Sequence, residues 1–252
     1  MLKSDIDQPQ LRRAWNAIDE IFFEHGLTLK RGYDFNHIDE CARKGGLNVL
    51  EAHFTPELNT YGNGRAFWLG LFANNNELIG RVCARLDHIK PPMCLTDLWR
   101  KELHRYYPSV RGGKVHLSER QPRFAQKISG KVVYLGGTIV HPDFQRFRLG
   151  GYLNQMAQIE ALDEWDADFF YGWMEHCGFK EGFWRNCGFS RAQFNAIRWA
   201  DGGPVPIDED LIWAGNDRDG VLDLIERILD FRQPSSLNRR SSQNQILSET
   251  SE

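Results

Sequence analysis

The 252-residue sequence has no long apolar run, and this excludes a membrane-spanning helix over the chain as given. No stretch reaches the roughly 18 consecutive apolar residues that such a helix requires. Residues 1–7 also lack the apolar core of a secretory signal. We therefore expect a cytoplasmic protein with no membrane partner.

An excess of charge of either sign is also missing. The chain has 31 Lys and Arg against 34 Asp and Glu, a net charge of −3, so nucleic acid is not an expected partner. The five cysteines form no CxxC pair, which disfavours a disulfide framework or a zinc ribbon. No HxH or HxxxH spacing is found among His104, His116, His141 and His176, so no metal is predicted.

What the sequence does contain is an alternation of helix and strand patterns. Apolar residues at three- and four-residue spacings predict helices over 10–25, 36–44, 95–107, 149–163, 180–186 and 219–231. Apolar, β-prone runs predict strands over 66–73, 77–86, 131–140, 169–174 and 192–199. The first two strands flank a turn of three asparagines and are expected to form a β-hairpin. The fold class that follows is α/β (α+β), a mixed central sheet flanked by helices.

Residues 1–200 are expected to form one domain with an inserted helical segment at 88–130. A C-terminal extension with a helix would follow at 201–232, and the polar composition of 233–252 predicts a disordered tail. The inserted segment carries aromatic residues and has two interpretations. It is either a lid over a substrate pocket or an element that packs within the fold or at a homodimer interface.

The segment between the strand at 131–140 and the helix at 149–163 has the features of an anion site. The first amide N–H groups of a helix have no partner within the helix, and the helix dipole adds partial positive charge there. Two arginines, Arg146 and Arg148, add full charges, while Gly150 and Gly151 leave room for a phosphate near the backbone. A diphosphate is a natural ligand of such a terminus.

This segment resembles the central motif of the GCN5-related N-acetyltransferase (GNAT) superfamily, V-x-P-x-x-[QR]-x-x-G-x-[GA], which binds the pyrophosphate of acetyl-CoA. Arg148 stands where the first glycine of the motif is expected. A second segment, Phe183–Phe189, is similar to the F-Y-x-K-x-G-F sequence that closes the same fold. The resemblance covers roughly 10–200 and implies a GNAT-like acyl-CoA-binding fold. The positions that match the first motif are Val140, Pro142, Gln145 and Gly150.

The resemblance implies acetyl-CoA, or another acyl-CoA, as co-substrate. It also implies an N-acyltransferase, in particular an N-acetyltransferase, that acts on the amine of a small molecule or peptide. Backbone groups of the motif strand would hold the pantetheine arm and polarise the acyl carbonyl. The cofactor-binding positions carried over are Thr138, Ile139, Val140, Gln145, Arg146, Phe147, Arg148, Leu149, Gly150 and Gly151.

The two usual catalytic groups of the family are missing. Gly136 and Gly137 occupy the positions of the common glutamate base, and Trp184 replaces the tyrosine acid, although an indole N–H is not a useful proton donor. The replacement candidates are two residues after the strand at 169–174 and one on the motif strand. They are Glu175, His176 and Tyr134.

Three functions stay open at this point. The first is the N-acyltransferase, and the second is a degenerate, non-catalytic acyl-CoA-binding module. The third is a nucleotide-binding protein of another α/β family. A covalent mechanism through Cys177 is disfavoured, because transfer in the family is direct and the neighbouring His176 would point away from it on a strand.

Overall fold

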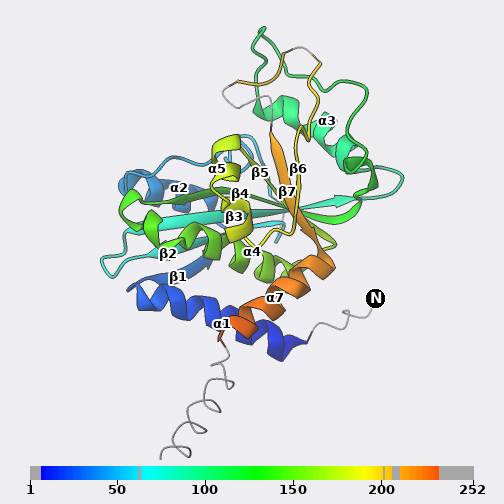
Figure 1. Ribbon diagram of the computed structural model, residues 1–252. Coiled ribbons are helices and arrows are strands. Elements are labelled where there is room, and N and C mark those ends of the chain that lie inside the picture. Colours follow the sequence, from blue (N-terminus) through cyan, green and yellow to red (C-terminus); the bar gives the residue numbers. More distant parts are fainter. Residues whose placement is uncertain (1–6, 62–63, 201, 206–210, 233–252) are drawn as a thin grey trace, which may run out of the picture.

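The computed structural model describes residues 7–61, 64–200, 202–205 and 211–232. Its centre is a seven-stranded sheet with the order β1-β2-β3-β4-β5-β7-β6 (Figure 1). Only β4 and β5 are parallel, and all the other neighbours are antiparallel. The strands are β1 (Thr28–Gly32), β2 (Ala66–Phe72), β3 (Leu78–Ile89), β4 (Gly130–Val140), β5 (Phe169–Met174), β6 (Arg191–Gln193) and β7 (Ile212–Asp217).

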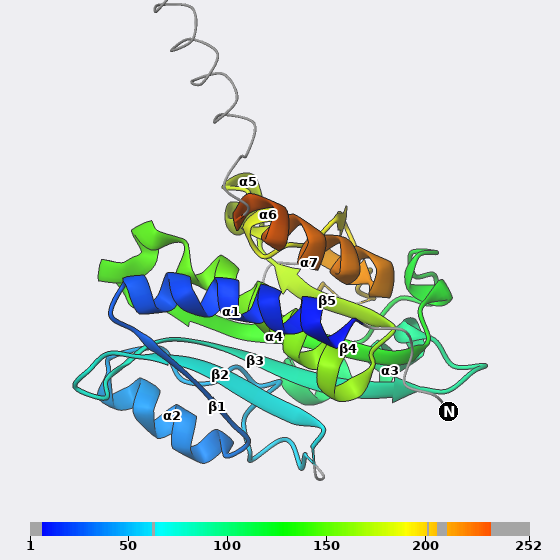
Figure 2. The same ribbon diagram turned by 90° about the horizontal axis from the view of Figure 1, so that it is seen from below.

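Helices cover both faces of this sheet, so the predicted mixed sheet flanked by helices is confirmed. Figure 2 shows α1 (Gln8–Glu24) and α4 (Leu149–Trp165) on the face opposite α2 (Phe35–Lys44). The helix α7 (Arg218–Arg232) contacts α1 and α4, while α3 (Leu95–Tyr106) contributes to the core beside α2. Each face has its own apolar core. The shorter helices are η1 (Ala125–Lys127), η2 (Pro142–Phe147), α5 (His176–Lys180) and α6 (Phe183–Asn186).

The elements with strong local patterns form where the sequence predicts them. Every residue of β2 is buried, as expected for a strand covered on both faces. The hairpin of β2 and β3 is confirmed by its antiparallel register. Helix α1 begins at Asp7, whose carboxylate accepts the backbone N–H of Gln10, and the chain turns away at Gly26 with φ +69°.

Two predicted elements are wrong. The strand at 192–199 is only β6, because the backbone leaves the sheet through Asn195 (φ +47°) and its later apolar residues are buried outside any ladder. The helix at 180–186 is only α6, because α5 ends at Lys180 and Gly182, with φ +74°, separates the two short helices. The sequence also did not predict β1 or β7.

Residues 211–232, which the sequence assigns to a C-terminal extension, supply a strand in the interior of the sheet. Strand β7 lies between β5 and β6, and α7 follows it directly. The predicted tail at 233–252 lies outside the described residues. Within the described ranges, no helix has the length and apolar character needed to cross a membrane.

The inserted segment packs against the connection between β6 and β7. Trp99 of α3 is fully buried, with its ring 4.9 Å from that of Trp173 on β5. Isolated bridges join Ser109 to Pro204 and Leu117 to Trp199, so two distant parts of the chain run together beside α3 (Figure 1). The lid and dimer interpretations of this segment stay predictions.

Candidate functional site

The parallel strands β4 and β5 pair over three residues and then separate. Their register joins Val132–Tyr134 to Phe169–Tyr171. Beyond this, β4 continues beside β3 and β5 continues beside β7, with no further ladder between β4 and β5 in the described ranges. A cleft of about 610 Å³ lies at the open end, between the last residues of β4, the start of α4 and the short helices α5 and α6.

Seven of the ten predicted cofactor-binding residues line this cleft. From β4 come Thr138, Ile139 and Val140, and the others are Gln145, Arg148, Gly150 and Gly151. The remaining lining residues come from the opposite wall and are Cys177, Gly178, Glu181, Phe183 and Asn186. The structure therefore brings the end of the motif strand and the first turn of α4 to one cavity.

The three other predicted residues do not line the cleft. Leu149 is fully buried in the apolar core. The ring of Phe147 lies 4.3 Å from that of His25, and the guanidinium of Arg146 lies over Phe147 at 4.6 Å. These side chains hold the loop against α1 rather than facing the cavity.

The unusual arginine of the motif has a left-handed backbone. Arg148 has φ 57° and ψ 22° at the start of α4. A glycine adopts this conformation without the steric cost of about 1–2 kcal/mol that a β-carbon adds. The local backbone therefore explains why the family motif has glycine here, while the exposed Arg148 side chain contributes a positive charge at the helix start.

Amide side chains on α4 fix the two walls of the cleft. Asn154 is buried and donates to Thr138 Oγ1 (3.0 Å) and to the carbonyl of Gly150 (2.8 Å), which ties β4 to α4. Gln155 donates to the carbonyl of Asn186 at 2.7 Å, and Gln158 donates to that of Cys187 at 2.7 Å. The sequence analysis missed these residues because it assigned α4 by its apolar face alone.

The face of β4 that carries α2 holds a carboxylate that the sequence analysis also missed. Two residues of β4, Gly137 and Thr138, lie opposite the single residue Val82 of β3, which is a β-bulge. Gly137 has φ +61°, and its N–H donates to the carboxylate of Glu51. The hydroxyl of Tyr134 also reaches this carboxylate, 3.5 Å from Oε2. Glu51 thus contacts Gly137, the residue directly before Thr138, which lines the cleft.

The environment of Glu51 favours its protonated form. The residue retains solvent access, yet its carboxyl group is surrounded closely enough by protein that desolvation raises its pKa. The Gly137 N–H and the charge of Arg81 act in the opposite direction, and the charge of Glu175 raises the pKa further. A carboxylate that is accessible and more basic than usual can accept a proton from a substrate.

Tyr134 explains the glycine that replaces the usual base. Its ring is buried and stacks on Phe54, with 5.6 Å between centroids. A β-carbon at Gly136 would lie 2.7 Å from the Tyr134 hydroxyl, so a side chain there would force the Tyr134 ring to move. Burial raises the pKa of Tyr134 well above its ordinary value. The phenol therefore keeps its proton, which suits a hydrogen-bond donor to Glu51 better than an acid.

The two other predicted catalytic residues follow β5. Glu175 precedes α5, and its Oε2 accepts a weak contact from the Cys177 thiol at 3.9 Å. The ring of His176 lies 6.2 Å from that of Phe194. The structure thus brings Glu175 into electrostatic contact with Glu51, while His176 packs toward a different segment. Among the described residues, no group of three Cys, His, Asp or Glu side chains could hold a metal ion.

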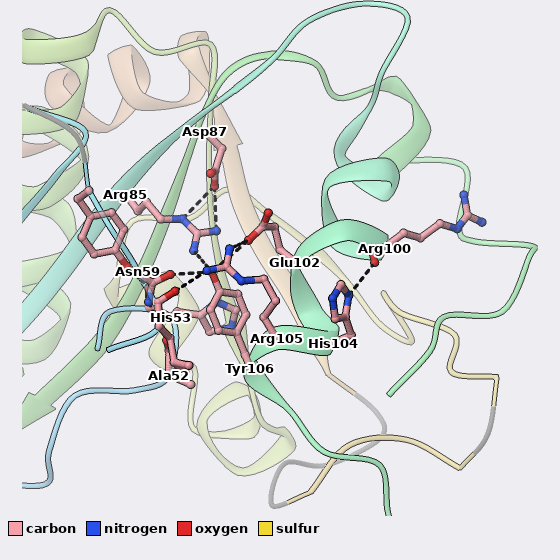
Figure 3. Close-up of polar contacts among 12 residues, drawn as sticks. Ala52, His53, Asn59, Arg85, Asp87, Arg100, Glu102, His104, Arg105 and Tyr106 are labelled. Atoms are coloured by element: carbon pink, nitrogen blue, oxygen red, sulfur yellow. Dashed lines mark hydrogen bonds and ion pairs between the residues drawn. The ribbon is translucent and has the colours of Figure 1, made fainter. Parts of the chain in front are cut away.

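A buried arginine of β3, Arg85, has polar partners on β3 and α3 (Figure 3). The guanidinium of Arg85 bonds to Asp87 at 2.9 and 3.1 Å and to the hydroxyl of Tyr106 at 3.0 Å. It lies over the Tyr134 ring at 5.6 Å. Burial, aided by the Arg85 charge, lowers the pKa of His53 well below its ordinary value, so this imidazole is neutral. The ring of His53 contacts those of Tyr106 and Tyr134, and Tyr134 in turn reaches Glu51.

A search of solved structures finds several that are similar to this chain at low sequence identity. NAA60 of Arabidopsis thaliana in complex with acetyl-CoA is 11% identical, with 77% of this chain and 99% of that chain covered and a TM-score of 0.42. Mutant forms of the spermidine/spermine N-acetyltransferase SpeG from Vibrio cholerae are 12% identical, with 79% and 98% covered and a TM-score of 0.41. FeeM, an N-acyl amino acid synthase from uncultured soil microbes, is 14% identical, with 79% and 94% covered and a TM-score of 0.43.

No protein-family model matches the sequence, and no curated protein is significantly similar to it. The assignment of the fold therefore rests on the topology of the chain itself. Three features of that topology agree with the GNAT-like fold that the sequence resemblance implies: the strand order, the parallel pair β4 and β5 that separates after three residues, and the helix α4 that begins beside the gap.

Proposed function

We propose that this protein is an acyl-CoA-dependent N-acyltransferase in which Glu51 is the general base. The observation that carries the proposal is the position of Glu51, whose carboxylate is held by the Gly137 N–H beside the cleft-lining Thr138. A proton acceptor and the cleft expected to hold the thioester are thus neighbours. The acyl group proposed is acetyl, and the acceptor is the amine of a small molecule or peptide.

In this proposal the first turn of α4 binds the pyrophosphate of the acyl-CoA. The free N–H groups of its start, with the charge of Arg148, would hold the pyrophosphate. Backbone groups of Thr138, Ile139 and Val140 would then extend along the pantetheine arm toward the bulge. The thioester carbonyl would arrive near Gly137, on the side of β4 where Glu51 lies.

The chemistry needs a neutral amine at that point. Glu51 takes one proton from the incoming ammonium, and the nitrogen lone pair attacks the thioester carbonyl. The C–N bond forms, the C–S bond breaks, and the second proton of the nitrogen passes to the departing thiolate, so that an amide and a free thiol result. The hydrogen bond from Tyr134 keeps the carboxylate of Glu51 pointed at the bulge during this transfer.

A non-catalytic acyl-CoA-binding module is the second candidate. It is favoured by Trp184 in place of the usual acid and by the raised pKa of Tyr134, since neither side chain readily protonates a thiolate. On this alternative the cleft binds the acyl-CoA, and Glu51 serves only to brace the bulge.

Release of free thiol from acetyl-CoA over a panel of amines separates the two candidates. We expect release by the wild-type protein and a loss of at least about 100-fold in Glu51→Gln, the range for removal of a general base. Glu57→Gln, an exposed glutamate in the same segment, is the matched control and should match the wild type. Binding of CoA, measured by calorimetry, should survive in both variants. Binding without release for any amine would support the module, and absence of binding would refute both candidates.

A further inference from the structure

A fully buried arginine lies beneath the loop that carries Glu51. Arg81 of β3 is 1% exposed and faces the side of the sheet that holds α2. Its Nη2 donates to the carbonyl of Val49 at 2.9 Å. Within the described ranges, its Nε and Nη1 have no hydrogen-bond partner. Burial of a cation with so few partners is costly, so packing alone does not explain an arginine at this position.

The loop above Arg81 is held on both sides of Glu51. Arg81 fixes the carbonyl of Val49, and Asp39 of α2 accepts the N–H of Leu50 at 2.8 Å. The side chain of Glu51 itself is fixed by the Gly137 N–H. Three consecutive residues, 49–51, are therefore anchored to β3, α2 and β4 in turn. A loop fixed in this way presents its carboxylate in one place.

The groups around Glu51 differ in sign. Two groups of β4 face it, the Gly137 N–H and the Tyr134 hydroxyl. The Cys83 thiol on β3 and the Tyr107 hydroxyl at the end of α3 also interact with it. The Glu175 carboxylate, after β5, adds a negative charge. On α2, Asp39 adds a negative charge near Cys83. Arg81 is a cation, and its charge acts to lower the pKa of Glu51.

We propose that Arg81 is the positioning residue for Glu51: it anchors the loop through Val49 and supplies a positive charge that opposes the effect of burial on the carboxylate beside the bulge of β4. The inference rests on the proposed function, in which Glu51 accepts the proton of the amine. It gives a reason for a buried guanidinium whose Nε and Nη1 have no hydrogen-bond partner among the described residues.

Three substitutions separate charge from shape at this position. Arg81→Met removes the charge and keeps an apolar side chain of similar reach, and such replacements of buried charges are often neutral or stabilising. Arg81→Gln also removes the charge but keeps a donor for Val49. Arg81→Lys keeps the charge. Arg100→Met, a partly exposed arginine on α3, is the control for loss of a cation elsewhere.

The first measurement does not need activity. Carbon-13 labelling of glutamate carboxyl groups, with Glu51 assigned by its absence in Glu51→Gln, gives the titration midpoint of Glu51 by NMR. We expect the midpoint to rise in both Arg81→Met and Arg81→Gln and to stay near the wild-type value in Arg81→Lys and Arg100→Met. Midpoints in Arg81→Met and Arg81→Gln that coincide with the wild type in folded protein would overturn the inference.

The second measurement links the midpoint to transfer. The ratio of kcat/KM at pH 9 to that at pH 6 should increase in Arg81→Gln, by up to about tenfold for a midpoint shift of one unit, the low end of the effect of one opposite charge on a neighbouring carboxyl. A brace with no electrostatic role would lower the rate equally at both pH values, which would also overturn the inference. If the NMR midpoint shifts as expected and no amine is acylated, the positioning role stands and the proposed function fails.

Discussion

Two adjacent glycines at the start of α4 should respond differently to the same substitution. Both Gly150 and Gly151 line the cleft, where we expect their lack of a side chain to let a phosphate approach the backbone. Their surroundings differ, however. A β-carbon on Gly151 would lie 2.7 Å from the carbonyl oxygen of Asn186, whereas one on Gly150 would lie 3.4 Å from Phe183 and from Val140.

The distances give the expected magnitudes. A contact of 2.7 Å with backbone forces α6 to move, which costs about 1–3 kcal/mol in overpacking and weakens the bond from Gln155 to Asn186, worth about 1 kcal/mol. Alanine regains up to about 1 kcal/mol of helix propensity. We therefore expect Gly151→Ala to lower the free energy of unfolding by about 2 kcal/mol. Gly150→Ala keeps the propensity gain with an ordinary contact, so its change should lie between zero and about 1 kcal/mol of stabilisation.

Thermal unfolding followed by circular dichroism tests this pair. For a chain of this size, 2 kcal/mol corresponds to a Tm about 4–8 °C lower for Gly151→Ala. The Tm of Gly150→Ala should match or slightly exceed that of the wild type. Equal Tm values for the two variants, or a less stable Gly150→Ala, would refute the packing of α6 against α4. Titration with CoA then reports whether Gly150→Ala, with its fold intact, blocks the phosphate.

Three more predictions follow from single contacts. Arg148→Gly should raise the Tm, because glycine adopts the left-handed backbone conformation without the steric cost of about 1–2 kcal/mol that a β-carbon adds. Arg148→Glu should abolish CoA binding in calorimetry. Normal binding by Arg148→Glu would contradict a pyrophosphate at this loop. Glu51→Gln should have a higher Tm than the wild type at pH 8, because burial raises the pKa of Glu51 in the folded state and its ionised form therefore costs stability. This gain in Tm should vanish below about pH 4, where the carboxyl is neutral. A gain that is independent of pH would count against the raised pKa. Gly136→Ala should lower the free energy of unfolding by about 1–3 kcal/mol, because its β-carbon would be too close to the Tyr134 hydroxyl. Adding Tyr134→Phe to Gly136→Ala should restore part of the Tm. If the double variant shows the sum of the two single effects, the contact is absent.

The sequence predicts those elements of the fold whose signal is local. Strand β2 and helix α4 have apolar patterns that follow from burial on their own. Strand β1 escapes prediction because it lies at the edge of the sheet and is mostly exposed, so it has no alternating pattern. Strand β7 is short and ends in Gly215, Asn216 and Asp217, which are turn-forming residues, although Asn216 is fully buried and bonds to Gln158 at 2.6 Å.

The candidate site divides in the same way. The loop proposed to hold the pyrophosphate is continuous in sequence, so its motif can be recognised without a structure. Glu51 cannot be found by this route, because nothing in its local sequence marks it. Its significance comes from Gly137 and Tyr134, which are distant in the chain and approach it only when the segment before β2 folds over β4. Arg81 in a β-prone run likewise gives no indication that its guanidinium is buried.

The absence of a glutamate on the motif strand has a structural reason that does not require loss of catalysis. The Tyr134 hydroxyl occupies the space that any side chain at position 136 would need, so a base on this strand and a phenol packed along it exclude each other. The bulge at Gly137 turns an N–H out of the ladder, and that N–H holds a carboxylate from another segment. On the proposed function, Glu51 supplies the proton acceptor at this place beside the cleft. On this reasoning Gly136 and Tyr134 belong to one arrangement, and a glutamate introduced at 136 would displace Tyr134 from Glu51 rather than restore a missing base.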